Sequence, residues 1–159
     1  MEEKIYTQSE LTEAVRLAIQ DRATWFYLLL KAGEKQGVDT EKMAYDAITE
    51  FGKIKGRKMA DAKNAGELVD KISEGQGFYA FAMERVKSED KVGELKFRHC
   101  ALVEAWKKLG CSPEEIKTLC KLASYGDFGI VSCFPELKLE FPELLSHGDD
   151  CCHMVITKR

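Results

Sequence analysis

Cysteine is the residue type in this sequence that could take part in the widest range of chemistry, and every copy lies after residue 99. In an oxidising compartment such a set predicts disulfides, whereas in a reducing compartment it predicts packed thiols, metal ligands or nucleophiles. The opening residues, MEEKIYTQSE, are acidic and lack the apolar run of a secretion signal, and the apolar stretch 25–30 is too short to cross a bilayer. We therefore expect a cytoplasmic protein with reduced thiols and no membrane contact. The six cysteines are Cys100, Cys111, Cys120, Cys133, Cys151 and Cys152.

Cys100 lies where a strand pattern gives way to a helical one, and His99 immediately precedes it. A thiol at the N-terminus of a helix has a lowered pKa because the free amides and the helix dipole stabilise the thiolate. This placement is typical of a nucleophile, although a buried structural cysteine explains the pattern equally well. His99 should point inward at the end of the strand and away from its neighbour, which favours a buried core histidine over a catalytic base.

Cys120 and Asp127 lie further along the same half of the chain. Cys120 shares an apolar helix face with Ile116 and Ala123, a pattern that favours packing over reactivity. Asp127 follows Gly126, a residue type that commonly ends a helix, and precedes an apolar segment. At such a junction a carboxylate can cap local amides, or it can point into a site as a base or a ligand.

The segment SHGDDCCH, residues 146–153, concentrates imidazole, carboxylate and thiol groups. Its composition suggests zinc or an iron–sulfur cluster, since both bind thiolates. The sequence contains no C-x-x-C pair, however, and Cys151 and Cys152 should face opposite sides of a strand. A turn over 147–150 explains half of the cluster without any ligand, so metal binding is the less favoured interpretation and the identity of a metal stays unknown.

The part of the chain that precedes the candidate site residues, residues 1–75, is predicted to be mainly helical. Thr7 and Glu10 form a capping box, and apolar residues then recur at helical spacing, with Arg22 as the interruption of that stripe. The basic run 53–58, KIKGRK, lies at the end of the second helix, where cations complement the helix dipole. We favour this explanation over a site for an anionic ligand or nucleic acid. The predicted helices span about 8–32, 40–56 and 64–73.

The pattern changes from helical spacing to alternation in the second part. Within residues 94–99 the charged side chains Glu94 and Lys96 alternate with apolar ones, which is typical of a strand with one buried face. We therefore expect one α+β domain over 1–159, in which a helical layer over 1–75 is followed over 78–159 by an antiparallel sheet interrupted by a helical pair. This second part carries the candidate site. Its predicted strands are 81–88, 94–99, 128–134, 137–141 and 151–157, and its predicted helices are 100–109 and 112–126.

The charge and the missing motifs exclude several classes of function. The formal net charge of −3 lacks the basic excess with which proteins bind nucleic acid. The sequence contains no G-x-G-x-x-G, P-loop, G-x-S-x-G or H-E-x-x-H motif. The expected partner is therefore a small molecule, not a nucleic acid or a membrane, and assembly into a homo-oligomer is left open.

The order of these groups resembles the L-2-amino-thiazoline-4-carboxylic acid hydrolase family over about residues 80–158. The resemblance rests on HCALVEAWKKLG at 99–110, SPEEIKTLC at 112–120, Asp127, and HGDDCCHM at 147–154. Ala101 stands where the family usually has proline, and Met154 where it usually has an aromatic residue. The family's recurring polar positions fall on Cys100, Cys120, Asp127, Asp149 and Cys152.

The resemblance implies a hydrolase that acts on a C–N bond of a small cyclic amidine and opens a 2-amino-thiazoline ring to an N-carbamoyl-cysteine. It implies Cys100 as the nucleophile or water-polarising group, with Asp127 and His147 as proton carriers. A basic residue that the pattern does not identify would bind the substrate carboxylate. The full implied set is Cys100, Asp127, His147 and Asp149 as catalytic positions and Cys120, Cys152 and His99 as substrate-binding positions.

The ending Gly148-Asp149-x-x-Cys152 is also similar to small-molecule-binding domains related to the 4-vinyl reductases. The alternative function is therefore a non-catalytic module that holds a small molecule, metal or cluster through the same thiols. No cofactor is required by the sequence, and a thiolate-bound metal is left open. In either case we expect Cys100, Cys120 and Cys152 to converge with Asp127 on one pocket, within on the order of 10 Å.

Overall fold

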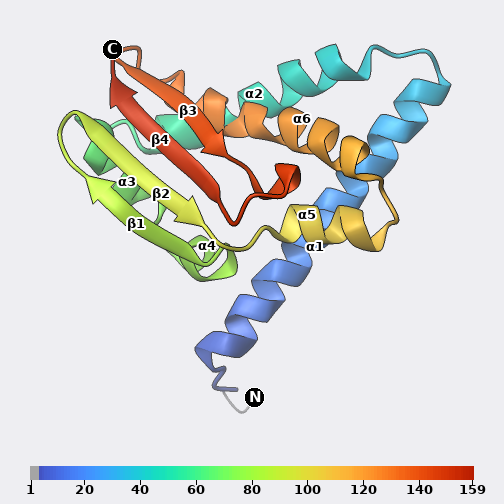
Figure 1. Cartoon of the computed structure of the whole chain (residues 1–159), viewed down its shortest axis with the longest axis horizontal. Coiled ribbons are helices and arrows are strands. Elements are labelled where there is room, and N and C mark those ends of the chain that lie inside the picture. The colour runs from blue at the N-terminus through green and yellow to red at the C-terminus, as the bar shows by residue number, and fades with distance from the viewer. Residues whose placement is uncertain (1–3) are drawn as a thin grey trace.

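The computed structural model describes residues 4–159 and places helices first and an antiparallel sheet second (Figure 1). The strand order is β1-β2-β4-β3, and each neighbouring pair is antiparallel. The fold is α+β, as the sequence predicted. Within the described residues, no helix is both long and apolar enough to cross a membrane. The elements are α1 (Gln8–Lys35), α2 (Thr40–Lys58), α3 (Ala65–Ile72), α4 (Gln76–Ala80), β1 (Met83–Ser88), β2 (Val92–Phe97), α5 (Ala101–Lys108), α6 (Pro113–Val131), β3 (Leu137–Glu143), the 3-10 helix η1 (Leu145–His147) and β4 (Cys152–Lys158).

Helices α1 and α6 begin at the predicted capping boxes. The Thr7 amide donates to Glu10 Oε2 over 2.8 Å, and the Glu10 amide donates back to Thr7 Oγ1 over 3.2 Å. Ser112 and Glu115 exchange the same two bonds over 2.9 and 3.2 Å, directly before the first turn of α6. These reciprocal bonds satisfy amides that have no partner inside the helix. They therefore fix where both long helices start.

The sheet buries one face against helices and leaves the other polar. Leu95 of β2 and Met154 of β4 are register partners, and both are buried on the covered face together with Ile156. They pack in one cluster with Leu68 of α3 and Ile130 of α6. Because side chains alternate along a strand, Cys152 shares this covered side with Met154. The start of β4 therefore points toward the helical layer.

A second apolar cluster joins α1, α5 and α6. Trp106 of α5 is fully buried, and its indole N–H donates to the Ala23 carbonyl oxygen of α1 over 3.1 Å. Leu119 and Leu122 of α6 belong to the same cluster. This packing holds the N-terminus of α5 close to the middle of α6.

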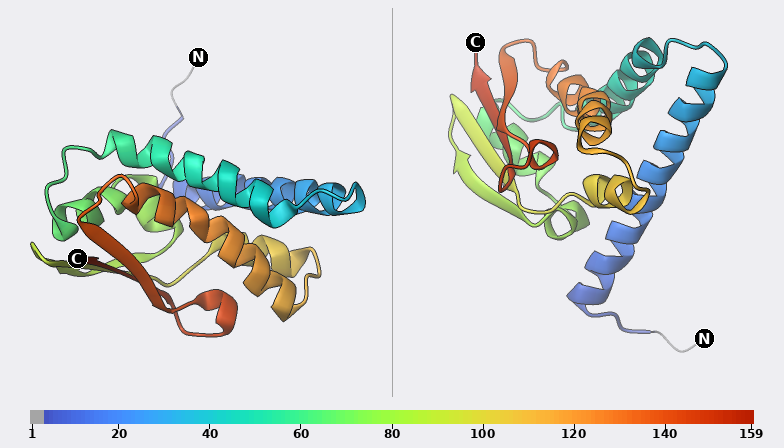
Figure 2. Two further views of the ribbon diagram at one scale, coloured as in Figure 1. Left: turned by 90° about the horizontal axis from the view of Figure 1, so that it is seen from above. Right: turned by 45° about the vertical axis from the view of Figure 1, so that its right-hand side comes forward.

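Helices α2 and α6 run side by side and meet through glycines (Figure 2). A Cβ added at Gly52 of α2 would clash with the Gly126 carbonyl oxygen of α6, and one at Gly129 would clash with the Thr49 carbonyl oxygen. A Cβ at Gly56 would lie 2.7 Å from the Ile130 carbonyl oxygen. The two backbones are thus closer than any side chain would allow. We call this contact the glycine seam.

The strand predicted over 128–134 is wrong. Helix α6 continues through Gly126 and ends only at Val131. Gly126 has the pattern of a helix terminator, but α6 runs through it, and its carbonyl oxygen lies where a Cβ on Gly52 of α2 would be. Tertiary packing along the glycine seam therefore keeps this apolar segment helical. Asp127 accordingly lies inside a helix, not at a junction between helix and strand.

Candidate active site

Cys100 is the N-cap residue of α5, has an extended backbone, and is separated from the end of β2 by Arg98 and His99. Its side chain makes no capping hydrogen bond. Burial raises the pKa of the Cys100 thiol to about 11, and the charges of Cys120 and Asp127 act in the same direction. The amides of Val103 and Leu102 oppose these effects without overcoming them. The predicted lowering of this pKa by the helix N-terminus is therefore wrong, because desolvation outweighs the helix amides.

Cys120 lies on α6 and is partly exposed. Burial raises the pKa of its thiol, and the carboxylate of Asp127 adds to that increase. The buried Ser146 hydroxyl of η1 lowers the same pKa, although it forms no well-aligned hydrogen bond with any described residue. The 3-10 helix η1 therefore packs against α6 at this cysteine.

Cys152 opens β4 and pairs in register with Phe97 of β2. Its sulfur accepts a hydrogen bond from the Leu145 amide over 3.4 Å. Burial raises the pKa of the Cys152 thiol to about 12, and charges on Cys100, Cys120 and Asp127 contribute to the increase. Residues from α5, α6 and β4 are thus close enough for their charges to interact.

Asp127 lies on α6 seven positions after Cys120, which places both side chains on one helix face. Burial raises the pKa of the Asp127 carboxyl group to about 6, and the ammonium of Lys55 opposes that increase. No hydrogen bond from residues 4–159 stabilises its charged form. The structure therefore brings Cys100, Cys120, Cys152 and Asp127 together, and we call these four residues the thiol–carboxylate cluster. All four retain partial solvent exposure.

The remaining predicted site residues occupy other surroundings. His147 is exposed at the end of η1. Asp149 is exposed, and its Oδ2 accepts a hydrogen bond from the Leu144 amide over 2.8 Å. This bond closes the loop that precedes β4, which is a structural role. Neither residue is among the main influences on the pKa of the clustered thiols.

His99 is partly buried, and its Nε2 has no hydrogen-bond partner among the described residues. Burial lowers the pKa of His99, and the charge of Arg16 on α1 lowers it further. The backbone amide of His99 donates to the Phe81 carbonyl oxygen over 3.1 Å. The side chain therefore faces α1, so the predicted contact with substrate stays a prediction.

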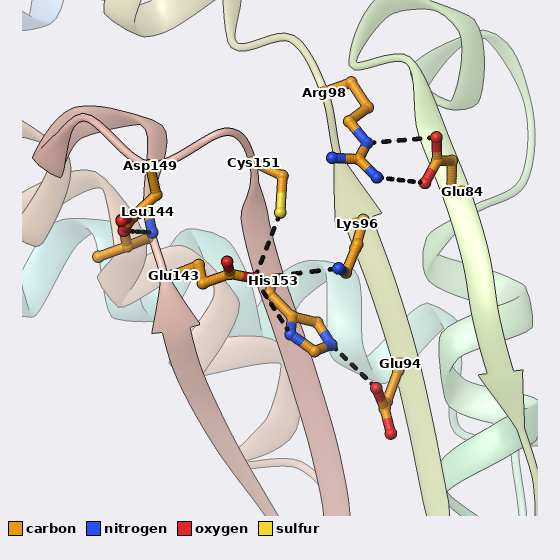
Figure 3. A network of polar contacts seen from close by, with 9 residues as sticks. All are labelled: Glu84, Glu94, Lys96, Arg98, Glu143, Leu144, Asp149, Cys151 and His153. Carbon is orange, nitrogen blue, oxygen red and sulfur yellow. Dashed lines mark hydrogen bonds and ion pairs between the residues drawn. The ribbon is translucent and has the colours of Figure 1, made fainter.

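Sequence reasoning missed a polar network on the open face of the sheet (Figure 3). His153 Nε2 lies 2.9 Å from Glu94 Oε2, and His153 Nδ1 lies 3.6 Å from Glu143 Oε2. The buried Cys151 sulfur lies 3.6 Å from the same Glu143 oxygen. Strand alternation could have found this network, since it separates Cys151 and His153 from Cys152. Within residues 4–159, no group of His, Cys, Asp and Glu side chains is arranged to hold a metal ion.

Two surface hollows lie outside the thiol–carboxylate cluster. One, of about 240 Å³, lies between the end of α6 and the start of β3 and includes Cys133 and Pro135. The other, of about 340 Å³, lies between α1 and α6 and includes Tyr27 and Thr118. Neither contains a member of the cluster. The chemically capable groups and these two hollows are thus separate features.

Residues 16–156 match the family model of L-2-amino-thiazoline-4-carboxylic acid hydrolase. The chain belongs to this family. The match begins within α1, so the hydrolase family model includes the helical N-terminal part as well as the cluster. Comparisons with curated proteins and with solved structures gave no significant match.

Proposed function

We propose that this protein hydrolyses 2-amino-thiazoline-4-carboxylate, or a close analogue, at the thiol–carboxylate cluster. Family membership supports the substrate class. The observation that carries the proposal is Asp127, whose carboxyl pKa is raised by burial to about 6 beside three thiols. A carboxylate with a pKa near neutrality can accept a proton during one step and return it in the next. Asp127 is therefore the proposed general base.

The thiols are proposed to act in their neutral form. With a pKa of about 11, Cys100 holds only about one part in ten thousand as thiolate at neutral pH. A standing thiolate therefore does not supply the nucleophile. We assign that role to a water molecule activated by Asp127, and we assign Cys100 the polarising role that the resemblance implied. His147 and Asp149 are left out of the proposed mechanism.

The reaction balances with one water and one general base. Asp127 takes a proton from water as its oxygen adds to the ring carbon that is bonded to both nitrogens and to sulfur. The C=N electron pair moves to the ring nitrogen, which takes up the proton that Asp127 accepted from the water. The tetrahedral centre then collapses: Asp127 accepts the proton of the added hydroxyl group as its oxygen forms a carbonyl group, and it gives this proton to the leaving atom.

The leaving atom decides the product. Breaking the bond from this carbon to the ring nitrogen would leave the carbamoyl group on sulfur. Breaking the bond to sulfur leaves it on nitrogen and releases a free thiol, which gives N-carbamoyl-cysteine. The expected N-carbamoyl product therefore requires scission of the C–S bond, and we revise the expectation of C–N scission accordingly. A thiolate is also a better leaving group than a nitrogen anion, because a thiol S–H is a far stronger acid than the N–H group that the nitrogen anion would form.

The test is product formation from 2-amino-thiazoline-4-carboxylate. We expect a new free thiol, measured with a thiol-specific chromogenic reagent, and a mass increase of one water. Asp127→Asn should reduce kcat/KM roughly 100-fold or more, whereas the exposed neighbour change Asp150→Asn should not. Absence of turnover by the wild-type protein, with and without added divalent metal, would reject the hydrolase proposal.

The alternative is ligand binding without turnover. The neutral state of the three thiols favours it, since such groups can line a site without attacking its ligand. Calorimetric binding of the thiazoline carboxylate without product formation would support this alternative. Turnover that depends on Asp127 would exclude it.

A further inference from the structure

Two cationic side chains from different helices converge on the ring of Phe51. Arg22 of α1 places its Cζ 6.0 Å from the centre of this ring, and Lys55 of α2 places its Nζ 4.6 Å from the same point. Phe51 is 41% exposed, so the ring forms a platform that solvent can reach. Figure 2 shows α1 and α2 diverging from their short connection.

This platform adjoins the thiol–carboxylate cluster. A Cβ added at Gly126, the residue before Asp127, would lie 3.8 Å from Phe51 Cδ1. The ammonium of Lys55 and the carboxylate of Asp127 also influence each other's pKa. The two cations therefore lie beside the proposed general base, at a place accessible to solvent.

Neither cation forms an ion pair within the part of the chain that the structure describes. Arg57, two positions after Lys55, forms an ion pair of 2.7 Å with Glu50. Arg22 and Lys55 form no ion pair with any residue in 4–159, although Asp127 is near enough to affect Lys55. Two like charges held close together repel each other, and an anion placed between them would relieve that repulsion.

The titration behaviour of Lys55 agrees with this geometry. Although the residue as a whole is exposed, its ammonium lies over the Phe51 ring. Burial lowers the pKa of Lys55, the charge of Arg22 lowers it further, and Asp127 raises it. A bound carboxylate would favour the charged ammonium and return this pKa toward its usual range.

We propose that Arg22 and Lys55 form the subsite for the substrate carboxylate, a proposal that rests on the function proposed above. The guanidinium of Arg22 can bind a carboxylate through two parallel N–H donors, and Lys55 adds a compact charge. The Phe51 ring supports the flat heterocycle, whose reactive carbon then faces Asp127. This assignment explains the interruption of the α1 stripe by Arg22, and it revises our interpretation of the basic run 53–58 as only a helix terminus.

Measuring ligand binding and turnover separately distinguishes a failure of this subsite from a failure of the proposed reaction. Calorimetry would compare wild type, Arg22→Gln and Lys55→Gln with two ligands, thiazolidine-4-carboxylate and 2-amino-thiazoline. The first has the carboxylate but no C=N carbon to hydrolyse, and the second has the amidine but no carboxylate. Lys58→Gln is the matched control, because it removes the same charge from the same helix near Lys55 but has no contact with the Phe51 ring.

We expect Arg22→Gln and Lys55→Gln each to weaken thiazolidine-4-carboxylate binding roughly tenfold or more. Both variants should leave 2-amino-thiazoline binding unchanged, and Lys58→Gln should change neither affinity more than about twofold. Charge-dependent binding without turnover of the amino-thiazoline carboxylate would retain the subsite and reject the hydrolase. Turnover with carboxylate affinity unaffected by both variants would retain the hydrolase and reject the subsite. Failure of wild type to bind thiazolidine-4-carboxylate would also reject the subsite.

Discussion

Lys55 of α2 and Asp127 of α6 influence each other's pKa across the glycine seam without forming an ion pair. Burial raises the pKa of Asp127 to about 6, and the nearby ammonium limits that increase. A closer ion pair would lower the carboxyl pKa further and make Asp127 a weaker base. The separation of the two groups therefore keeps the carboxylate able to accept a proton near neutral pH.

The activity should depend on pH through Asp127. The base must be ionised, so kcat/KM should rise with pH and level off above an apparent pKa of about 6. Because Lys55 lowers the pKa of Asp127, Lys55→Gln should move this acid limb to higher pH. Lys58→Gln, measured in parallel, should leave it in place. An acid limb that is the same in wild type and Lys55→Gln would contradict the proposed coupling.

Removal of the Asp127 charge should stabilise the fold at neutral and higher pH. Its pKa is raised from 3.8 to about 6, so the unfolded state loses this proton at lower pH than the native state. The ionised Asp127 therefore lowers the free energy of unfolding. This loss is absent below pH 4, grows between pH 4 and pH 6, and reaches at most about 3 kcal/mol above pH 6. Asp127→Asn should therefore unfold at higher urea than wild type at pH 8, with the difference vanishing near pH 4. An equal difference at both pH values would contradict burial as the cause.

The clustered thiols should react slowly with alkylating agents. Because burial raises the pKa of Cys100 to about 11 and that of Cys152 to about 12, both hold little thiolate at pH 8. Mass spectrometry after timed iodoacetamide treatment should show both at least about tenfold slower than cysteine in an unstructured peptide. If Cys100 were alkylated faster than the peptide, a preformed thiolate nucleophile would replace activated water in the mechanism.

The glycine seam should tolerate no added methyl group. Gly129→Ala places a Cβ against the Thr49 carbonyl oxygen, so α2 and α6 would have to separate. We expect a loss of about 2 to 3 kcal/mol and a fall in Tm of roughly 5 to 10 °C. Gly77→Ala is the matched control, since a Cβ there meets nothing within 4 Å. Comparable melting curves for the two variants would show that the seam is not a close contact.

The locally encoded features of this fold could be predicted from the sequence. The capping boxes at Thr7 and Ser112 fixed two helix starts, and the hairpin of β1 and β2 followed from alternation and turn residues. These signals involve residues a few positions apart, so no tertiary information is needed to interpret them.

Features that depend on distant contacts could not be predicted. Gly126 has the sequence pattern of a helix end, and only the tertiary structure shows that α6 continues through it with its backbone against Gly52 of α2. Cys100 has the local setting of an activated thiol, but α6 and β4 bury it and reverse the expected pKa shift. Arg22 and Lys55 lie on different helices and are far apart in the sequence. No local sequence pattern therefore predicts that both contact Phe51.

The glycine seam also separates the scaffold from the residues that we propose determine specificity. Helices α2 and α6 are held in register by main-chain contacts, whereas Phe51 and Lys55 project from the adjacent side of α2. These side chains can therefore be exchanged without rebuilding the helix contact that positions Asp127. A designer could retune the charge and size of the accepted ring at positions 22, 51 and 55 while keeping the same catalytic base, and natural variation at these positions could diversify substrates in the same way.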